Sequence, residues 1–299
     1  MAQRQRGSVL VIGSVNLDFI IKSDIPLPGQ TVLGESYSKR AGGKGANQAV
    51  AASRISKNVC LVGCIGVDTE GEILKDSLKK NNVDTKFLFK NQEFSNSGTA
   101  FVVVDTKGEN SISVIPASNY GLTIENIDTA IKEVQPEVLL LQAEINLDVL
   151  KEVLKKYSSK IRIIFNLAPY FNVSKELITE CDPLIVNELE AKDLLGIEIK
   201  ENYQEITDLF SKICKSAIVT LGSQGVLICE ESSYEKIPAL PIKHVIDSTG
   251  AGDAFVGSCA AYIASGLPIK EASRKATKFA GISVSRPGGF DSYPEIEEI

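Results

Sequence analysis

The sequence predicts an α/β fold: a doubly wound, mainly parallel sheet that is flanked by helices and carries a small β-sheet lid. Short β-branched runs alternate with helical segments along most of the chain. Long helices between successive strands imply parallel pairing through right-handed crossovers. Two segments break this alternation with paired strand patterns, and we expect them to form the lid.

The elements of the main sheet follow one another from the N-terminus. The apolar run 8–13 ends in glycine and is typical of a buried strand. The alanine-rich segment 45–54 has helical spacing, and strand character returns at 59–65. The remaining expected elements are helix 70–81, helix 124–134, strand 138–141, helix 147–157, strand 161–166, strand 184–186, helix 188–195, helix 204–214, strand 217–220 and a long apolar helix after residue 253.

The lid is expected from two separate segments, about 17–40 and 99–115. The runs 17–22 and 31–39 read as one strand pair, and 99–105 and 111–115 as another. Gly108 suits the hairpin loop of the second pair. We therefore expect one domain over residues 1–299, with the lid strands inserted between units of the main sheet.

Composition excludes several classes of protein. The 32 lysines and arginines against 38 acidic residues give a net charge of −6, which argues against nonspecific binding to nucleic acid. No apolar run approaches the ~20 residues that span a bilayer, and the basic N-terminus lacks a signal-peptide cleavage site. The six cysteines are scattered, and His244 alone cannot complete a zinc set with them. We expect a cytoplasmic protein with free thiols.

The most informative motif is Asp247-Ser-Thr-Gly-Ala-Gly-Asp253, which precedes the long apolar helix. Backbone N–H groups at such a turn can face an anion, and the helix dipole adds to the attraction. A carboxylate beside that anion hole is what a phosphoryl transferase needs, because a base must accept the acceptor hydroxyl's proton. The alternative is an ordinary helix with an aspartate in its first turn.

A second glycine cluster, Ala41-Gly-Gly-Lys-Gly-Ala-Asn47, opens a helix, and Asn16-Leu-Asp18 follows the first strand. The glycines allow a polyol to approach the backbone, and the asparagine and aspartate side chains can bond adjacent hydroxyls. Neither a Walker motif nor a dinucleotide fingerprint is present, so hydride chemistry is disfavoured.

Six motifs occur in a fixed order along the chain. They are Asn16-Leu-Asp18, Gly42-Gly-Lys-Gly-Ala-Asn-Gln-Ala49, Gln142-Ala-Glu144, Asn187-Glu-Leu-Glu190, Thr220-Leu-Gly-Ser-Gln-Gly225 and Asp247-Ser-Thr-Gly-Ala-Gly-Asp253. The ordered set resembles the ribokinase-like family of sugar and nucleoside kinases, from Val9 to Pro294.

The resemblance implies ATP-dependent phosphorylation of D-ribose at O5, which gives D-ribose 5-phosphate. It also implies Mg²⁺ with the ATP, a bound K⁺ and a homodimer formed through the lid. A kinase for 2-deoxyribose, a ketose or adenosine is the alternative within the family. A catalytically idle relative that senses sugar is the alternative outside it.

The resemblance also assigns roles to individual residues. Asp253 is the expected base, with the anion hole at Gly250, Ala251 and Gly252. The expected sugar ligands are Asn16, Asp18, Gly43, Lys44, Asn47 and Glu144, together with Asp253. Asn16 is expected to meet the 2-hydroxyl, which favours ribose over 2-deoxyribose.

On the nucleotide side, the resemblance implies contacts from Asn187, Glu190, Thr220, Gly222, Ser223, Gly225, Gly252 and Thr277. Asn187 and Glu190 are expected to organise Mg²⁺ through water. Read alone, that pair also fits a helix capping box, and Thr220–Gly225 also fits an ordinary glycine hairpin.

The implied K⁺ loop consists of Asp247, Thr249, Ser283, Arg286, Gly288 and Ser292. Most of them would act through backbone carbonyls, and the charge of Arg286 is expected to point away. A rigid surface loop without a cation is the alternative.

Overall fold

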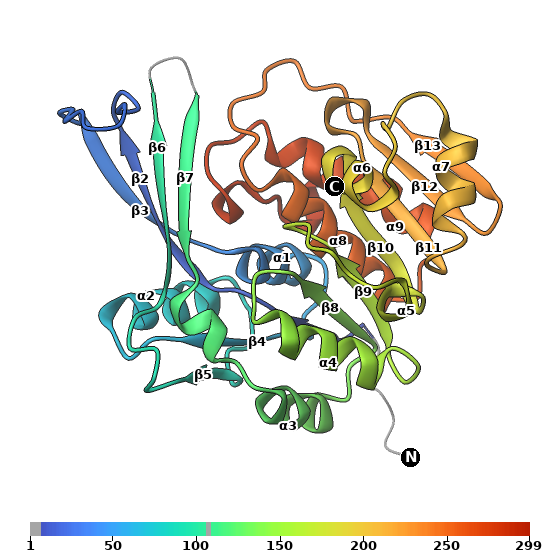
Figure 1. The fold of residues 1–299 in the computed structure, drawn as a ribbon, viewed down its shortest axis with the longest axis horizontal. Coiled ribbons are helices and arrows are strands. Elements are labelled where there is room, and N and C mark those ends of the chain that lie inside the picture. Colours follow the sequence, from blue (N-terminus) through green and yellow to red (C-terminus); the bar gives the residue numbers. More distant parts are fainter. Residues whose placement is uncertain (1–6, 106–108) are drawn as a thin grey trace.

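The computed structural model describes residues 7–105 and 109–299. Its main body is a nine-stranded sheet in the order β13-β12-β11-β10-β9-β8-β1-β4-β5 (Figure 1). The strands are β1 (Val9–Ile12), β4 (Val59–Ile65), β5 (Leu88–Lys90), β8 (Val138–Gln142), β9 (Arg162–Asn166), β10 (Cys181–Asn187), β11 (Ser216–Thr220), β12 (Val226–Glu230) and β13 (Ser233–Ile237). Pairing is parallel from β5 to β11, and only β12 and β13 run antiparallel, so the predicted α/β class is confirmed.

Two layers of helices cover the sheet because its strands alternate their apolar side chains between the faces. Val9 and Val11 of β1 join one core, and Leu10 and Ile12 join the other. The first core is closed by α1 (Lys44–Ser53), α2 (Thr69–Lys80), α8 (Ala251–Ala264) and α9 (Ile269–Ser283). The second is closed by α3 (Ile124–Val134), α4 (Leu147–Tyr157), α5 (Lys175–Ile178), α6 (Glu188–Leu195) and α7 (Tyr203–Phe210).

A second sheet of four strands stands away from this body (Figure 1). Its order is β3-β2-β6-β7, from β2 (Asn16–Lys22), β3 (Ser36–Gly42), β6 (Gly98–Val104) and β7 (Asn110–Ile115). Both predicted strand pairs are antiparallel hairpins, and parallel pairing of β2 with β6 joins them. The predicted loop residue Gly108 lies outside the described residues, as does the N-terminal segment 1–6.

Some predicted boundaries are wrong. The strand expected at 31–39 begins at Ser36, because Ser36 pairs with Lys22, the last residue of β2, and earlier residues have no strand to pair with. The helix expected at 204–214 ends at Phe210. The strands β5, β12 and β13 were not expected, but the antiparallel pairing of β11 with β12 across residues 221–225 is the glycine hairpin that was the alternative interpretation of this segment.

The parallel strands bring polar residues together at one edge of the main sheet. Their carboxyl ends carry Gln142 on β8, Asn166 on β9, Asn187 on β10 and Thr220 on β11. Ligands of open α/β sheets bind at this edge, and the N-terminus of α8 faces it. Within the described part of the chain, no helix has the length and apolar character needed to cross a membrane.

Candidate active site

The turn at the N-terminus of α8 is built on Gly250. Gly250 is the N-cap with φ 77°, a left-handed conformation that favours glycine. Tyr293 donates its phenolic hydrogen to the Gly250 carbonyl over 3.0 Å and so fixes the turn. The N–H of Ala251 donates to Ser248 O at 3.2 Å. No atom lies within 4 Å of a Cβ built at Gly252, so a ligand can approach the backbone there.

Asp253 follows in the first turn of α8, and both of its carboxylate oxygens are held. Asn47 Nδ2 donates to Oδ2 over 2.9 Å, and Gln48 Nε2 donates to Oδ1 over 2.8 Å. Both donors come from α1, which packs beside α8 in the core. The Asp253 carboxylate therefore has a fixed orientation.

Acidic groups crowd around one lysine next to Asp253. Burial, reinforced by repulsion from Glu144 and Asp253, raises the pKa of Asp18 to about 7. Asp253 in turn raises the pKa of Lys44, against the effect of desolvation, with help from Glu144 and Glu190. Lys44 Nζ lies 3.9 Å from Glu144 Oε1. The Lys44 ammonium thus reduces the electrostatic repulsion between these carboxylates.

The predicted sugar residues Asn16 and Glu144 line a small cavity of about 190 Å³. Asn119 Nδ2 donates to Asn16 Oδ1 over 2.8 Å, so Asn16 is left with its N–H₂ to offer. Ser14 Oγ donates to Glu144 Oε2 over 2.6 Å, and the Lys44 N–H donates to the same oxygen over 3.1 Å. The sequence analysis missed Ser14 and Asn119.

Gly43 brings the backbone of α1 against the end of β1. Its φ is 89°, and a Cβ there would lie 2.9 Å from Asn16 N and 3.0 Å from Ser14 O. A side chain at this position would push the glycine segment away from the backbone of Ser14 and Asn16.

A second cavity of about 180 Å³ adjoins Asp253. Lys44, Asn187, Glu190 and Thr220 line it, and so do Gly250 and Gly252. Asn187 and Glu190 form the capping box that was the alternative interpretation of this motif, with both bonds at 2.8 Å. Burial raises the pKa of Glu190. The same two residues, Asn187 and Glu190, therefore cap α6 and line the cavity.

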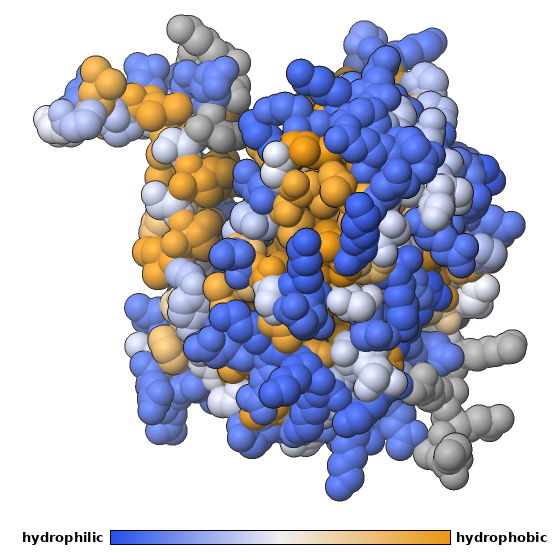
Figure 2. Space-filling model, turned by 45° about the vertical axis from the view of Figure 1, so that its right-hand side comes forward, coloured by the Kyte–Doolittle hydropathy of each residue, from blue (hydrophilic) through white to orange (hydrophobic). Residues whose placement is uncertain are grey.

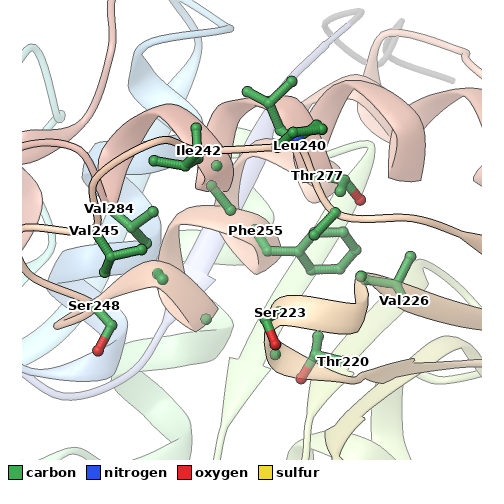
Figure 3. Close-up of a pocket in the computed structure, with 18 residues that line it drawn as sticks. Thr220, Ser223, Val226, Leu240, Ile242, Val245, Ser248, Phe255, Thr277 and Val284 are labelled. Carbon is green, nitrogen blue, oxygen red and sulfur yellow. The ribbon is translucent and has the colours of Figure 1, made fainter.

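A larger groove of about 660 Å³ opens on the far side of Gly252 (Figure 3). The predicted nucleotide residues Thr220, Gly222, Ser223, Gly225 and Thr277 line it. The sequence analysis missed most of its wall, which is apolar: Val226, Leu240, Ile242, Val245, Phe255, Ala280 and Val284.

Thr277 contributes less polarity to this groove than its residue type suggests. Its hydroxyl donates to the Ser273 carbonyl over 2.8 Å, within α9. The nucleotide side therefore offers shape and apolar surface more than side-chain hydrogen bonds.

The predicted cation loop is held together by Asp247. Its carboxylate accepts the N–H of Thr249 over 2.9 Å and that of Gly288 over 3.0 Å. Burial raises its pKa, but these bonds outweigh burial and hold the pKa below its usual range. The guanidinium of Arg40, which was not predicted here, lies 4.0 Å from the same carboxylate.

The other predicted members of this loop engage local partners. Ser283 and Ser292 donate their hydroxyl hydrogens to the carbonyls of Ala280 and Gly289. The charge of Arg286 points away and pairs with Glu298. Within the described residues, no cluster of three or more acidic, cysteine or histidine side chains could hold a metal ion.

The chain is similar to known proteins over nearly its whole length. The model of the pfkB family carbohydrate kinases matches residues 6–296. A ribokinase of Bacillus subtilis is 36% identical over 98% of this chain and 99% of its own length, and a deoxyribokinase of Salmonella typhi is 31% identical over 97% and 96%. The structure of Arabidopsis thaliana ribokinase complexed with ribose and ATP superposes with a TM-score of 0.86, at 25% identity, over 97% of this chain and 96% of that one. The chain therefore belongs to the pfkB family of carbohydrate kinases.

Proposed function

We propose that this protein transfers the γ-phosphoryl group of ATP to O5 of D-ribose, giving D-ribose 5-phosphate and ADP. The carrying observation is the place of Asp253: it lines the second cavity, which shares Thr220 and Gly252 with the groove, and Lys44 of that cavity lies 3.9 Å from Glu144 of the sugar-sized cavity. Asp253 takes the proton of the 5-hydroxyl, O5 attacks the γ-phosphorus, and the bond to the β-phosphate oxygen breaks. The N–H groups of Gly250 and Gly252 would face the charge on the transferred group, and the N–H of Ala251 would join them on release from its bond to Ser248 O.

The sugar is held by both acceptors and donors. Asp18 and Glu144 accept from its hydroxyls, and Lys44 and Asn47 donate. Asn16 donates to the 2-hydroxyl oxygen, because Asn119 already occupies its own oxygen. A site with such a donor disfavours 2-deoxyribose, which leaves the donor unpaired.

Magnesium ion fits the second cavity, where Asn187, Glu190 and Thr220 offer oxygen atoms, the ligands that this ion prefers. Bound with ATP, Mg²⁺ would neutralise charge on the phosphates. Glu190 holds its place for this role because its Oε2 is fixed on the Asn187 N–H. Lys44, in the same cavity, provides a second positive charge toward the phosphates.

Potassium ion is proposed for the loop around Asp247. One carboxylate with backbone carbonyls of residues 283–292 is a donor set suited to a large monovalent cation, and Asp247 already ties the two segments together. Bound K⁺ would order this loop beside the anion hole. A higher melting temperature in KCl than in NaCl at equal ionic strength is expected; equal melting temperatures in the two salts contradict it.

The second sheet is proposed to act as a lid inserted into a single domain. Val114 of β7 lines the sugar cavity, so the sheet covers the sugar and excludes water that would hydrolyse ATP. The register places Asp18, Ala100 and Val114 side by side. Beyond them, Ile112 continues the same face and is 55% exposed.

That exposed apolar face supports a homodimer through the lid, since apolar patches of this kind are usually covered. Hydrophobic residues gather over the second sheet in Figure 2. Ile112→Lys should yield monomers in analytical ultracentrifugation, whereas Tyr37→Lys on the opposite face should leave the dimer intact. Dimeric Ile112→Lys protein contradicts this interface.

The buried free cysteines favour a reducing cytoplasm.

The position of transfer can be tested by NMR of the product. Incubation with Mg-ATP and ¹³C-ribose should give coupling of ³¹P to C5 together with one ADP per sugar. Coupling to C1, or ATP hydrolysis without a phosphosugar, contradicts the proposal. A preference for 2-deoxyribose would keep the mechanism and move only the assignment of Asn16.

A further inference from the structure

A continuous chain of buried amides ends on the catalytic carboxylate. Gln142 Nε2, at the end of β8, donates to Gln48 Oε1 over 2.7 Å. Gln48 Nε2 donates to Asn166 Oδ1 over 2.9 Å and to Asp253 Oδ1 over 2.8 Å. Gln48 and Gln142 have no exposed surface, and Asn166 is 7% exposed. Amide chains buried to this degree cost free energy unless every orientation is satisfied.

The direction of this chain is set by a backbone carbonyl. Asn166 Nδ2 donates to the Ile185 carbonyl over 3.1 Å, and a carbonyl can only accept. Asn166 Oδ1 therefore faces Gln48, which must present Nε2 to it. Gln48 Oε1 then faces Gln142 and accepts its N–H. A reversed Gln48 would point an oxygen at the carboxylate of Asp253, so the backbone of β10 dictates that a donor reaches it.

In the described part of the chain, the amides around Asp253 leave two buried acceptors unsatisfied, Gln142 Oε1 and Asn47 Oδ1. Among the described residues, Gln142 Oε1 has no hydrogen-bond partner, which is destabilising for a buried acceptor. Gly13 makes room for it, because a Cβ at Gly13 would lie 2.0 Å from that oxygen. A role in packing alone would not require this cost, and an apolar side chain could fill the same space.

We propose that Gln48 is a positioning residue for phosphoryl transfer. Its N–H holds Oδ1 of Asp253 while Asn47 holds Oδ2, so the plane of the carboxylate is fixed before the sugar arrives. Bonds to a charged acceptor are stronger than neutral ones, and proton transfer depends on the orientation of the base. The inference rests on the proposed role of Asp253 as base.

The test is Gln48→Met in the full-length protein. Methionine matches glutamine in length but has no N–H to donate. We expect kcat to fall about 10- to 100-fold, while the KM values for ribose and ATP change by no more than a few-fold, because the bond matters in the transition state. Parallel losses in KM for both substrates would indicate a merely structural role and would overturn the proposal.

Gln142→Met is the matched control, since it makes the same change in the same chain without touching Asp253. Asn166 still orients Gln48 in this variant, so kcat should fall only a few-fold. Equal losses in the two variants, or a wild-type kcat in Gln48→Met, sink the inference. Turnover by an Asp253→Asn variant would contradict the proposed base, whereas equal losses in the two methionine variants would contradict only the role of Gln48. The two failures are therefore distinguishable.

If Gln48→Met does not fold, the wild-type protein still provides a test. The side-chain N–H₂ of Gln48, bonded on both sides, should exchange with D₂O far more slowly than that of the exposed Gln30, as followed by NMR. Its resonance should move in Asp253→Asn. Exchange as fast as that of Gln30 would mean that the bond to Asp253 is not maintained, and would overturn the proposal.

Discussion

The small cavity at Asn16 and Glu144, the proposed sugar cavity, and the larger groove at Thr277, the proposed nucleotide groove, have walls that are built differently. In the sugar cavity, polar side chains are bonded to one another before any ligand arrives, as Asn119 is to Asn16 and Ser14 to Glu144. The groove is wider and is walled by side chains such as Leu240 and Phe255. Its hydroxyl at Thr277 is already engaged within α9.

This difference predicts which of its two substrates the protein selects more strictly. A site of prearranged donors and acceptors rejects a ligand that lacks one hydroxyl, because a buried polar group is then left unpaired. An apolar groove binds by shape and discriminates weakly between polar variants of similar size. We therefore expect strict selection of the sugar and tolerant selection of the nucleotide base.

The largest effect should come from the residue that joins the two halves. Asp253→Asn removes the base, and kcat should fall by about 10³-fold or more, since general bases contribute about 10²–10⁴-fold and this one also faces the transferred group. ATP affinity, measured by calorimetry, should stay within a few-fold because the groove is untouched. Retained turnover would refute the role of Asp253.

The next effect isolates the sugar half. Asn119→Leu removes the donor that orients Asn16, so the Asn16 N–H₂ is no longer held toward the 2-hydroxyl. We expect kcat/KM for ribose to fall about ten-fold or more while that for 2-deoxyribose falls much less, since one polar contact is lost. Asn119→Asp, which cannot donate to Asn16, should behave similarly. An unchanged ratio between the two sugars would mean that Asn16 does not read the 2-hydroxyl.

A pH profile sharpens the same half. Asp18 must be ionised to accept from the sugar, and its pKa is raised to about 7 by burial and by Glu144 and Asp253. About half of Asp18 is ionised at pH 7 and about one-tenth at pH 6, so kcat/KM for ribose should fall about five-fold between them. A profile that is flat between pH 6 and 8 would contradict this role.

Without sugar, the stability of the protein should fall as pH rises, which is opposite to the pH dependence of kcat/KM. The folded state holds a proton on Asp18 that the unfolded chain releases between about pH 4 and 7, so this contribution to stability is present at low pH and lost as pH rises through 7. Asp18→Asn removes the loss. Its melting temperature should exceed that of the wild type by a few degrees at pH 8, and the gap should close near pH 4.

The smallest effect belongs to the nucleotide half. GTP and ITP should replace ATP with kcat/KM values within about ten-fold, because the side chains of the groove offer little to read the base edge. Initial rates at saturating ribose measure this directly. A preference for ATP of more than about 100-fold would show that backbone groups of the groove read adenine, and would end the contrast between the halves.

Sequence reasoning reached the parts of the site that depend on local chemistry. Gly250 and Gly43 could be predicted to lie in turns, because their positive φ angles favour glycine. Asp253 could be predicted from its position at the start of a helix. The main sheet could also be predicted, since its strands and helices alternate along the chain and show clear hydrophobic patterns.

The missed residues act through contacts that are distant in the chain. Gln48, Asn119 and Asn166 look ordinary locally, and their roles arise only when folding brings them to Asp253 and Asn16. Asn166 and Gln142 did carry one usable signal: each is a polar residue at the carboxyl end of a buried parallel strand. The apolar wall of the groove had no such signal, because residues 239–245 form an irregular segment without periodicity.

The most direct test is ADP release from Mg-ATP with ribose, 2-deoxyribose, fructose or adenosine, each in K⁺ or in Na⁺. We expect strong release with ribose, stimulated by K⁺, and weak release with the other three. Silence with every acceptor in both salts, from a folded sample, would contradict a sugar kinase and favour a protein that binds sugar without turning it over.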